Sequence, residues 1–181
     1  MKPIYLIGYM GSGKSTLGKE LARALHMTFI DLDERIEAMC GCTVSQIFSI
    51  HGEAHFRQLE QQALREVSAM TGVVVACGGG TPCQQGNMAL MNDTGVTVWL
   101  TTSVQRLTAR LLLEDEKRKR PRVAALPDDA VLAMVEQELQ QRTPHYAMAH
   151  LQFDSTDIET AQATTATARR LATVLQGLMN D

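Results

Sequence analysis

Residues 8–15 read GYMGSGKS, a complete match to the phosphate-binding loop pattern G-x-x-x-x-G-K-[ST]. The apolar run Ile4–Ile7 precedes the loop and has the composition of a buried strand. After the loop, Leu17, Leu21 and Leu25 recur at helical spacing, so a helix is expected to begin there. A strand, a glycine loop and a helix in this order form the context that the pattern requires. We therefore favour a phosphate-binding loop over a glycine-rich turn before an ordinary helix.

The loop has the residues to bind the phosphates of a nucleotide together with a magnesium ion. Glycines adopt backbone conformations closed to other residues, so main-chain N–H groups can approach phosphate oxygens closely. The start of the helix adds unpaired N–H groups and the positive end of its dipole. Lys14 is expected to reach the β- and γ-phosphates, and the Ser15 hydroxyl to bind Mg²⁺. The predicted nucleotide contacts are Gly11, Ser12, Gly13, Lys14, Ser15 and Thr16.

Composition indicates one globular domain and argues against several classes of partner. The 181 residues, 45% hydrophobic and 20% charged, suit one domain with a substantial core. A net charge of −3 gives no reason to expect nucleic acid or an anionic membrane as a partner. We find no targeting segment and no apolar run near the ~20 residues of a membrane span. The four cysteines lack zinc-site spacing and are expected to be reduced. We expect a cytoplasmic monomer.

Strand-like apolar runs alternate with helical patterns along the chain. The expected strands are Ile4–Ile7, Thr28–Ile30, Val73–Cys77, Val96–Leu100 and Leu151–Phe153. The expected helices cover about 14–25, 34–40, 53–70, 103–113, 128–142 and 160–178. This alternation predicts an α/β fold with a mostly parallel sheet and helices on both of its faces. Ligands of such sheets bind at the carboxyl ends of the strands.

Two carboxylates follow the second expected strand. Asp31 and Asp33 lie two residues apart at the end of this strand, and we expect them to have different tasks. If this strand lies beside the first one, Asp31 can face the magnesium ion next to Ser15. Asp33 then faces a substrate beyond the γ-phosphate. The alternative is an aspartate that caps the helix expected at 34, with a solvated neighbour.

Three consecutive glycines, Gly78–Gly80, follow the third expected strand. Because glycine loses more backbone entropy on folding than any other residue, such a run needs a reason. It is either a place where a ligand approaches main-chain N–H groups or a sterically tight crossover. Arg57 and Glu60 lie three residues apart on a helix, away from its apolar stripe. Such a pair is usually a surface ion pair of small energy.

The segment 114–122, EDEKRKRPR, carries mixed charges and no helical stripe, so a solvated loop is the default. Phosphoryl transfer, however, needs a cation over the γ-phosphate in the closed state, often delivered by a mobile element. Arg120, followed by the rigid Pro121, is a candidate for this cation. Arg142, at the end of a later expected helix, is placed to point back into the cleft.

Taken together, these residues resemble the shikimate kinase family. The similar motifs are Gly8–Ser15 with Thr16-Leu17-Gly18, Asp31-x-Asp33, Gly52-Glu53-x-x-Phe56-Arg57-x-x-Glu60, Gly78–Gly80, Arg120-Pro121 and Arg142-x-Pro144-x-Tyr146. The resemblance covers about residues 4–150, and it is the joint occurrence of the motifs that is specific. It implies a three-layer P-loop kinase fold of the nucleoside-monophosphate-kinase-like group, with a five-stranded parallel sheet in the order 2-3-1-4-5. Residues 1–181 would form a single domain, with a substrate-binding insertion at about 33–60 and a lid at about 113–126.

The resemblance also implies an activity, namely transfer of the γ-phosphate of ATP, with Mg²⁺, to the 3-hydroxyl of shikimate in aromatic amino-acid biosynthesis. The residues that it implies as catalytic are Lys14, Asp33 and Arg120. Those implied to hold shikimate are Asp33, Arg57, Gly79, Gly80 and Arg142. Ser15 and Asp31 are implied on the metal side, and Arg120 as the lid arginine on ATP. By position, Arg110 resembles the family's adenine-stacking arginine.

The chain departs from the family's pattern in two places. Arg122 follows Arg120-Pro121 where the family usually has an aliphatic residue, and 154–159 lacks the basic residue or proline often found near the adenine. The first alternative is a gluconate-type or other small-metabolite kinase of the same fold. A nucleoside monophosphate kinase and a non-catalytic nucleotide-binding switch are further alternatives. Release of ADP, measured with shikimate, gluconate, AMP and no acceptor, would separate them.

Overall fold

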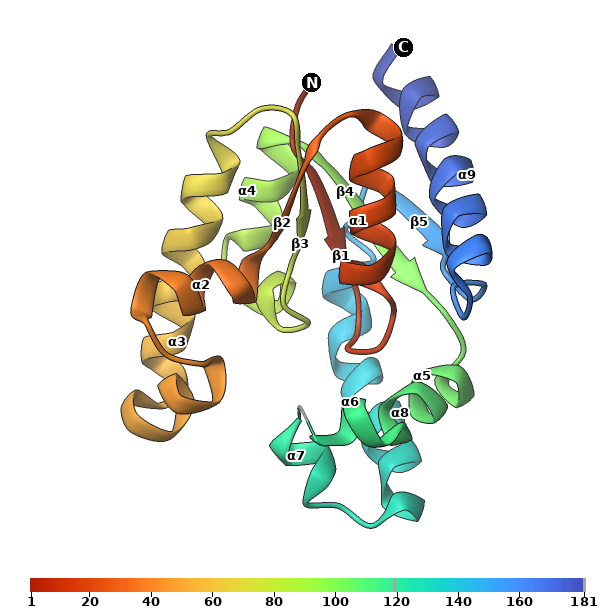
Figure 1. The fold of residues 1–181 in the computed structure, drawn as a ribbon. Helices are drawn as coiled ribbons and strands as arrows, with labels where there is room; N and C mark the ends of the chain where they lie inside the picture. Colours follow the sequence, from red (N-terminus) through yellow and green to blue (C-terminus); the bar gives the residue numbers. More distant parts are fainter. Residues whose placement is uncertain (119, 181) are drawn as a thin grey trace.

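The computed structural model describes residues 1–118 and 120–180, with a sheet of parallel strands between two layers of helices (Figure 1). The strands are β1 (Ile4–Ile7), β2 (Thr28–Asp31), β3 (Val73–Ala76), β4 (Val96–Thr101) and β5 (Leu151–Asp154). Their order is β2-β3-β1-β4-β5, and each neighbouring pair is parallel. The α/β fold and the strand order implied by the family resemblance are therefore confirmed.

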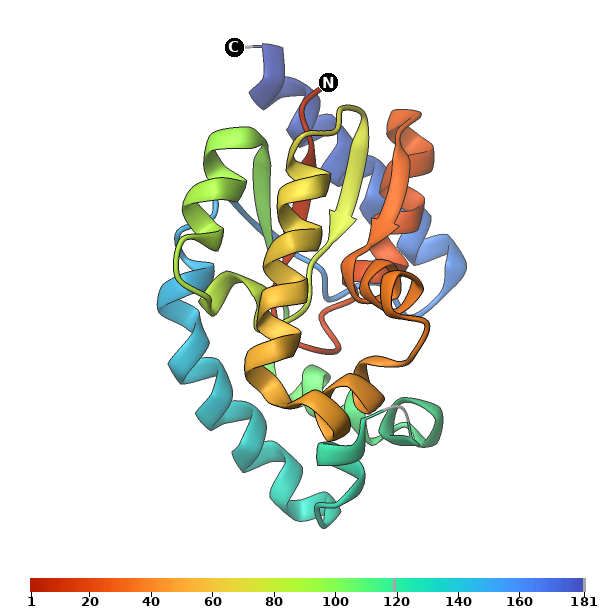
Figure 2. The same ribbon diagram turned by 90° about the vertical axis from the view of Figure 1, so that its left-hand side faces the viewer.

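Helices cover both faces of this sheet. They are α1 (Lys14–Leu25), α2 (Leu32–Cys40), α3 (Val44–Ser68), α4 (Asn87–Thr94), α5 (Val104–Leu112), α6 (Glu114–Arg118), α7 (Pro121–Ala124), α8 (Asp128–Tyr146) and α9 (Ala161–Asn180), with a 3₁₀ turn η1 (Thr81–Cys83). Helices α1 and α9 pack together on one face, and α3 and α4 lie on the other (Figures 1 and 2). The strands run toward α2 and the α5–α7 region. The carboxyl ends of the strands therefore lie on the side of the sheet where these helices are found (Figure 1).

The central strand β1 divides the core between the two faces. Successive side chains of a strand point to opposite faces of the sheet. Ile4 and Leu6 accordingly pack in a cluster with residues of α1 and α9, whereas Tyr5 and Ile7 pack with residues of α3, α4 and α8. All four are fully buried. A strand covered on both faces must be apolar throughout, as the sequence of β1 is.

Several helices differ from the expected ones. Helix α3 consists of two helical segments joined at Gly52, whose backbone is not helical (φ 78°), so the segment after Gly52 begins where the helix at 53–70 was predicted. The segment from Val44 to Gly52 was not predicted, and Thr43 and Gln46 form a capping box at its start. Helix α4 was not expected from the sequence. The segment expected as a solvated loop instead forms the short helices α6 and α7. Lys119, inside the expected lid, lies outside the described residues.

Helix α8 also differs from its expected bounds. Helix α8 runs to Tyr146 rather than ending at 142, so Pro144 lies inside its last turn. Across residues 1–118 and 120–180, no helix has both the length and the apolar character needed to cross a membrane.

Candidate active site

The phosphate-binding loop joins β1 to α1 and depends on its glycines. Gly13, directly before α1, has a φ of 90°, and a Cβ there would lie 2.0 Å from Cδ1 of Ile158. Gly8 has a φ of 141°, and a Cβ there would lie 2.7 Å from the carbonyl oxygen of Leu100. A side chain at either position would strain the backbone and collide with a neighbour. The first turn of α1 contains no acidic residue, so its N–H groups and positive dipole end are free to attract an anion.

Lys14 is half-buried at the end of the phosphate loop and bonds back to it. Its Nζ atom donates to the carbonyl oxygens of Gly8, at 2.8 Å, and Tyr9, at 2.9 Å. Burial lowers the pKa of Lys14 to about 8, against the opposing effect of the Asp33 carboxylate. The side chain faces a cavity of about 670 Å³, which is also lined by Ser15, Asp33, Gly78, Gly79, Arg110 and Arg120. Most of the predicted nucleotide contacts therefore line one cavity together with Asp33, the residue predicted to face the substrate.

Ser15 and Asp31 form a pair of oxygen donors beside the loop. The Ser15 hydroxyl donates to Oδ2 of Asp31 at 2.6 Å. The other oxygen, Oδ1, accepts from the N–H groups of Asp33, at 3.1 Å, and Glu34, at 3.4 Å, and so caps α2. Asp31 is thus both a carboxylate next to Ser15, as a metal site would need, and the N-cap of the helix that follows. Hydroxyl and carboxylate oxygens suit Mg²⁺, which takes one or two protein ligands and completes its shell with phosphates and water.

Asp31 reaches Ser15 by a different arrangement of elements from the one that the sequence indicated. Strand β3 lies between β2 and β1, so β2 is not the neighbour of the first strand. Residues two apart on a strand share a face. Asp33 instead belongs to the first turn of α2, so its separate environment comes from the start of this helix and not from an extended backbone. Helix α1 contacts both β2 and β3, and this packing brings Ser15 to Asp31.

Asp33 lines the cavity and carries an acceptor that no described residue uses. Its Oδ1 atom is buried and accepts no hydrogen bond from the described residues. Burial, with the charges of Asp31 and Glu60, raises the pKa of Asp33 to about 6. A buried acceptor without a donor is costly, so its presence on a cavity wall points to a ligand that donates to it. A ligand hydroxyl is such a donor.

The glycines 78–80 allow charged side chains to approach the main chain. A Cβ on Gly80 would lie 2.8 Å from Nη2 of Arg57, and one on Gly79 would lie 3.3 Å from Nη1 of Arg142. On Gly78, it would lie 3.1 Å from Oδ1 of Asp33. Each predicted acceptor-side residue therefore borders the glycine run. Arg57 and Arg142 do not line the 670 Å³ cavity itself. Arg142 approaches Gly79, which lines the cavity, and Arg57 approaches the next residue, Gly80.

Arg57 is not the surface ion pair that its spacing suggested. It donates to Glu60 at 2.9 Å, and Glu60 is fully buried. Glu60 also accepts from Thr81 Oγ1 at 2.6 Å, and Glu53 accepts from Arg57 Nη2 at 3.0 Å. Burial opposes the charge of Arg57, but the two glutamates raise its pKa overall. A buried acidic partner fixes the guanidinium beside the glycines.

Arg142 is held by residues that the sequence did not single out. Its Nη2 atom donates to Oε2 of Glu138 at 2.7 Å, and its guanidinium lies 5.3 Å from the centre of the Tyr9 ring. Tyr146, fully buried, donates to the carbonyl oxygen of Gly79 at 2.7 Å. Glu138 and Arg142 are four positions apart, a helical spacing from which their pairing could have been predicted.

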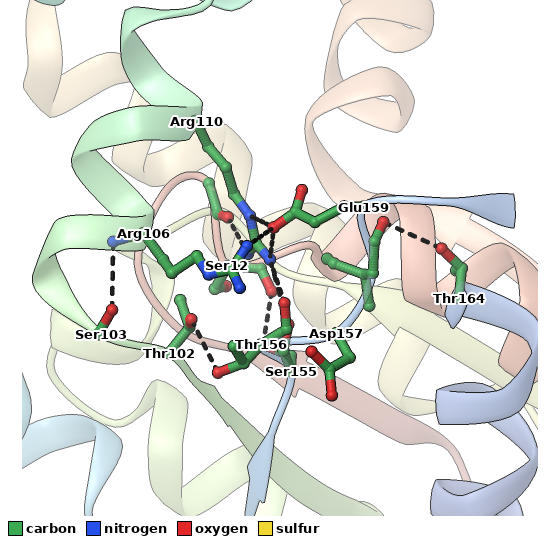
Figure 3. A network of polar contacts seen from close by, with 12 residues as sticks. Ser12, Thr102, Ser103, Arg106, Arg110, Ser155, Thr156, Asp157, Glu159 and Thr164 are labelled. Carbon is green, nitrogen blue, oxygen red and sulfur yellow. Dashed lines mark hydrogen bonds and ion pairs between the residues drawn. The ribbon is translucent and has the colours of Figure 1, made fainter. Parts of the chain in front are cut away.

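Arg120 and Arg110 line the same cavity as Lys14. Arg120 donates to the carbonyl oxygen of Glu116, at 3.0 Å, and to its carboxylate. Arg110 donates to the carbonyl oxygens of Gly11 and Thr156, each at 2.9 Å, and to Glu159 (Figure 3). These bonds use the edge of the Arg110 guanidinium and join the phosphate loop to the segment after β5.

A phosphate-binding loop facing a buried carboxylate, with arginines around the same cavity, defines a phosphate-loop kinase for a small hydroxylated acceptor. A family model described as shikimate kinase matches residues 10–173, and the chain belongs to this family. The family resemblance inferred from the motifs is confirmed.

Individual relatives, found by sequence and by structure, are also shikimate kinases. The shikimate kinase of Parabacteroides distasonis is 43% identical over 155 residues, which cover 86% of this chain and 88% of that protein. The crystal structure of shikimate kinase from Bacteroides thetaiotaomicron matches with a TM-score of 0.91 and 40% identity, over 97% of this chain and 98% of that one. Shikimate kinase from Acinetobacter baumannii in complex with shikimate matches with a TM-score of 0.79 and 33% identity, over 99% and 93%.

Proposed function

We propose that the protein transfers the γ-phosphate of ATP to the 3-hydroxyl of shikimate, a step of aromatic amino-acid biosynthesis. The observation that carries this proposal is Asp33, a carboxylate that lines the same cavity as Lys14 and has one oxygen without a donor among the described residues. A phosphate loop alone specifies only the phosphoryl donor. A carboxylate acceptor facing it indicates that the group receiving the phosphate is a hydroxyl. The relative from Acinetobacter baumannii, solved with shikimate, supports the identity of that acceptor.

On the donor side, the N–H groups of residues 11–16 would bind the phosphates of ATP, with Lys14 at the β- and γ-phosphates. Ser15 and Asp31 would hold Mg²⁺, which neutralises charge on the phosphate oxygens. The oxygen pair that they form at 2.6 Å supports this role. The face of the Arg110 guanidinium would stack on the adenine, because its edge is occupied by the protein (Figure 3).

On the acceptor side, Asp33 would hold shikimate hydroxyls, and Arg57 and Arg142 would bind its carboxylate. Guanidinium groups match carboxylates in geometry as well as in charge. The backbone at Gly79 and Gly80 would contact the ligand between the two arginines. Both arginines already approach these glycines closely, which supports a common site.

The chemistry needs mainly position and positive charge. The transition state of phosphoryl transfer is loose, so a strong base is not required. Asp33 would orient the attacking hydroxyl and accept its proton, while Lys14 and Arg120 would stabilise negative charge on the transferring phosphoryl group. We assign Lys14, Asp33 and Arg120 as the catalytic residues on this basis.

Release of ADP tests the proposal when it is measured in parallel with shikimate, gluconate, AMP and no acceptor. We expect acceleration by shikimate alone. Acceleration by gluconate but not by shikimate would overturn the assignment, and no acceleration by any acceptor would favour a nucleotide-binding switch.

The organisation of the chain enters the proposal as well. One domain, with a substrate-binding insertion at about 33–60 and a lid at about 113–126, is consistent with α2 and α3 on one side of the site and α6 and α7 on the other (Figure 1). A monomeric state and a cytoplasmic location stay predictions.

A further inference from the structure

The carboxylate of Glu138 is a meeting point for three segments of the chain. It is nearly buried and accepts from the Tyr9 hydroxyl at 3.0 Å, from Arg142 at 2.7 Å and from Arg122 Nη2 at 2.8 Å. Tyr9 belongs to the phosphate loop, Arg142 to α8 and Arg122 to α7 in the proposed lid. The donor side, the acceptor side and the lid therefore touch the same carboxylate.

The two carboxylate oxygens of Glu138 accept from different donors. Oε2 accepts from Tyr9 and Arg142, whereas Oε1 accepts from Arg122. With Arg122 in place, the cluster has two guanidinium groups and one carboxylate, and so an excess of one positive charge. Without Arg122, Glu138 and Arg142 would neutralise each other. Arg122 thus determines how much of the Arg142 charge is left for an anionic ligand.

Arg122 is the contact in this cluster that can change. Glu138 and Arg142 are four residues apart on one helix, so they stay neighbours wherever the lid lies. Arg122 comes from a helix of four residues, and its side chain is 75% exposed. An ion pair with so exposed a partner costs little to break. Charge at the acceptor site therefore depends on whether α7 is docked on α8.

A second cavity connects this contact with the acceptor site. It has a volume of about 780 Å³, lies between α7 and α8, and is lined in part by Arg122, Leu126, Met134, Glu138 and Arg142. Arg142 also borders Gly79, which lines the cavity with the phosphate loop. The arginine expected to bind the substrate carboxylate thus lies between the two cavities.

We propose that Arg122 is a positioning residue for the acidic substrate: by neutralising Glu138 from the lid, it leaves the positive charge of Arg142 for the substrate carboxylate. The proposal rests on the proposed function, because it takes shikimate as the acid bound by Arg142. It also gives a role to the residue at which the chain departs from its family's usual aliphatic side chain. Docking of the lid and binding of the acid would then favour each other.

The test is steady-state kinetics of Arg122→Leu, a change to the aliphatic type usual in the family. We expect KM for shikimate to rise about fivefold, the size of one partly exposed ion pair, while KM for ATP stays within about twofold. Arg122→Lys, which retains the charge, should recover most of the loss. Arg23→Leu is the matched control, because Arg23 is 74% exposed and pairs with Glu20 on α1, outside both cavities.

Two comparisons separate this role from a structural one. In a Glu138→Gln background, Arg122→Leu should no longer raise KM for shikimate, since its partner charge is gone. With an analogue that carries a hydroxymethyl group in place of the carboxylate, Arg122→Leu should have no effect. If Glu138→Gln is unstable, the comparison with the hydroxymethyl analogue alone distinguishes an electrostatic role of Arg122 from a structural one.

An unchanged KM for shikimate in Arg122→Leu would overturn the proposal. So would an equal rise for the hydroxymethyl analogue or in the Glu138→Gln background. Failure of the wild-type protein to phosphorylate shikimate at all would instead contradict the proposed function, and the two failures are therefore distinguishable.

Discussion

Ser15 on α1 donates a 2.6 Å hydrogen bond to Asp31 at the end of β2, although β3 lies between β2 and the strand β1 that leads to α1. One carboxylate oxygen serves this bond and the other caps α2. Asp31→Asn retains a good N-cap residue but removes the charge next to Ser15. We expect the Mg²⁺ concentration for half-maximal rate to rise about tenfold, with little change in thermal unfolding. An unchanged Mg²⁺ requirement in a titration of the rate would remove Asp31 from the metal side.

Asp33→Asn keeps the size of the side chain but loses the carboxylate that accepts from the substrate. We expect kcat to fall about 100-fold or more, because both orientation of the hydroxyl and proton acceptance are weakened. The measurement is turnover at saturating ATP and shikimate. Near-normal turnover under those conditions would exclude Asp33 from the mechanism.

Gly80→Ala tests the approach of Arg57 to the glycine run. The φ of Gly80 is −93°, so alanine is compatible with the backbone, but its Cβ would lie 2.8 Å from Arg57 Nη2. We expect the variant to fold and to show a KM for shikimate raised about tenfold, as the guanidinium is displaced. Gly177→Ala on α9, where a Cβ meets nothing within 4 Å, is the control. It should leave KM unchanged and stabilise the helix by about 1 kcal/mol. Equal KM values in both variants would show that the position of Arg57 is unimportant.

Arg120→Ala tests the lid arginine. Its side chain lines the cavity of Lys14 and bonds to Glu116 within the lid. Because its contact with the phosphoryl group would form in the closed state, we expect kcat to fall more than ATP affinity. A rise in KM for ATP alone, with kcat retained, would contradict the role.

The parts of the fold that the sequence predicted well are those encoded locally. Strand β1, the glycine loop and α1 follow from one contiguous pattern, and they lie where that pattern indicated. Helix α4 was missed because its segment shows no continuous apolar stripe: only Asn87, Met88 and Met91 are buried in it. The order of the strands came from the family resemblance, since no local pattern specifies which strands pair.

In the site, too, local features were predictable from the sequence and tertiary contacts were not. Lys14 and Ser15 were predictable from the loop, but the burial of Glu60 under Arg57 depends on packing against η1, which spacing does not reveal. The bond between Arg122 and Glu138 joins residues 16 apart on different helices. Such contacts arise from tertiary packing, so single-sequence periodicity carries no signal for them.

The position of the transferred phosphate tests the central claim most directly, namely that Asp33 presents a hydroxyl of shikimate to a nucleotide on the phosphate loop. The measurement is ³¹P–¹H correlation NMR of the product formed from ATP and shikimate. We predict stoichiometric ADP and a single product with phosphorus coupled to the proton at carbon 3 of the ring. Phosphate on another oxygen, or ADP without a phosphorylated ring, would contradict the account.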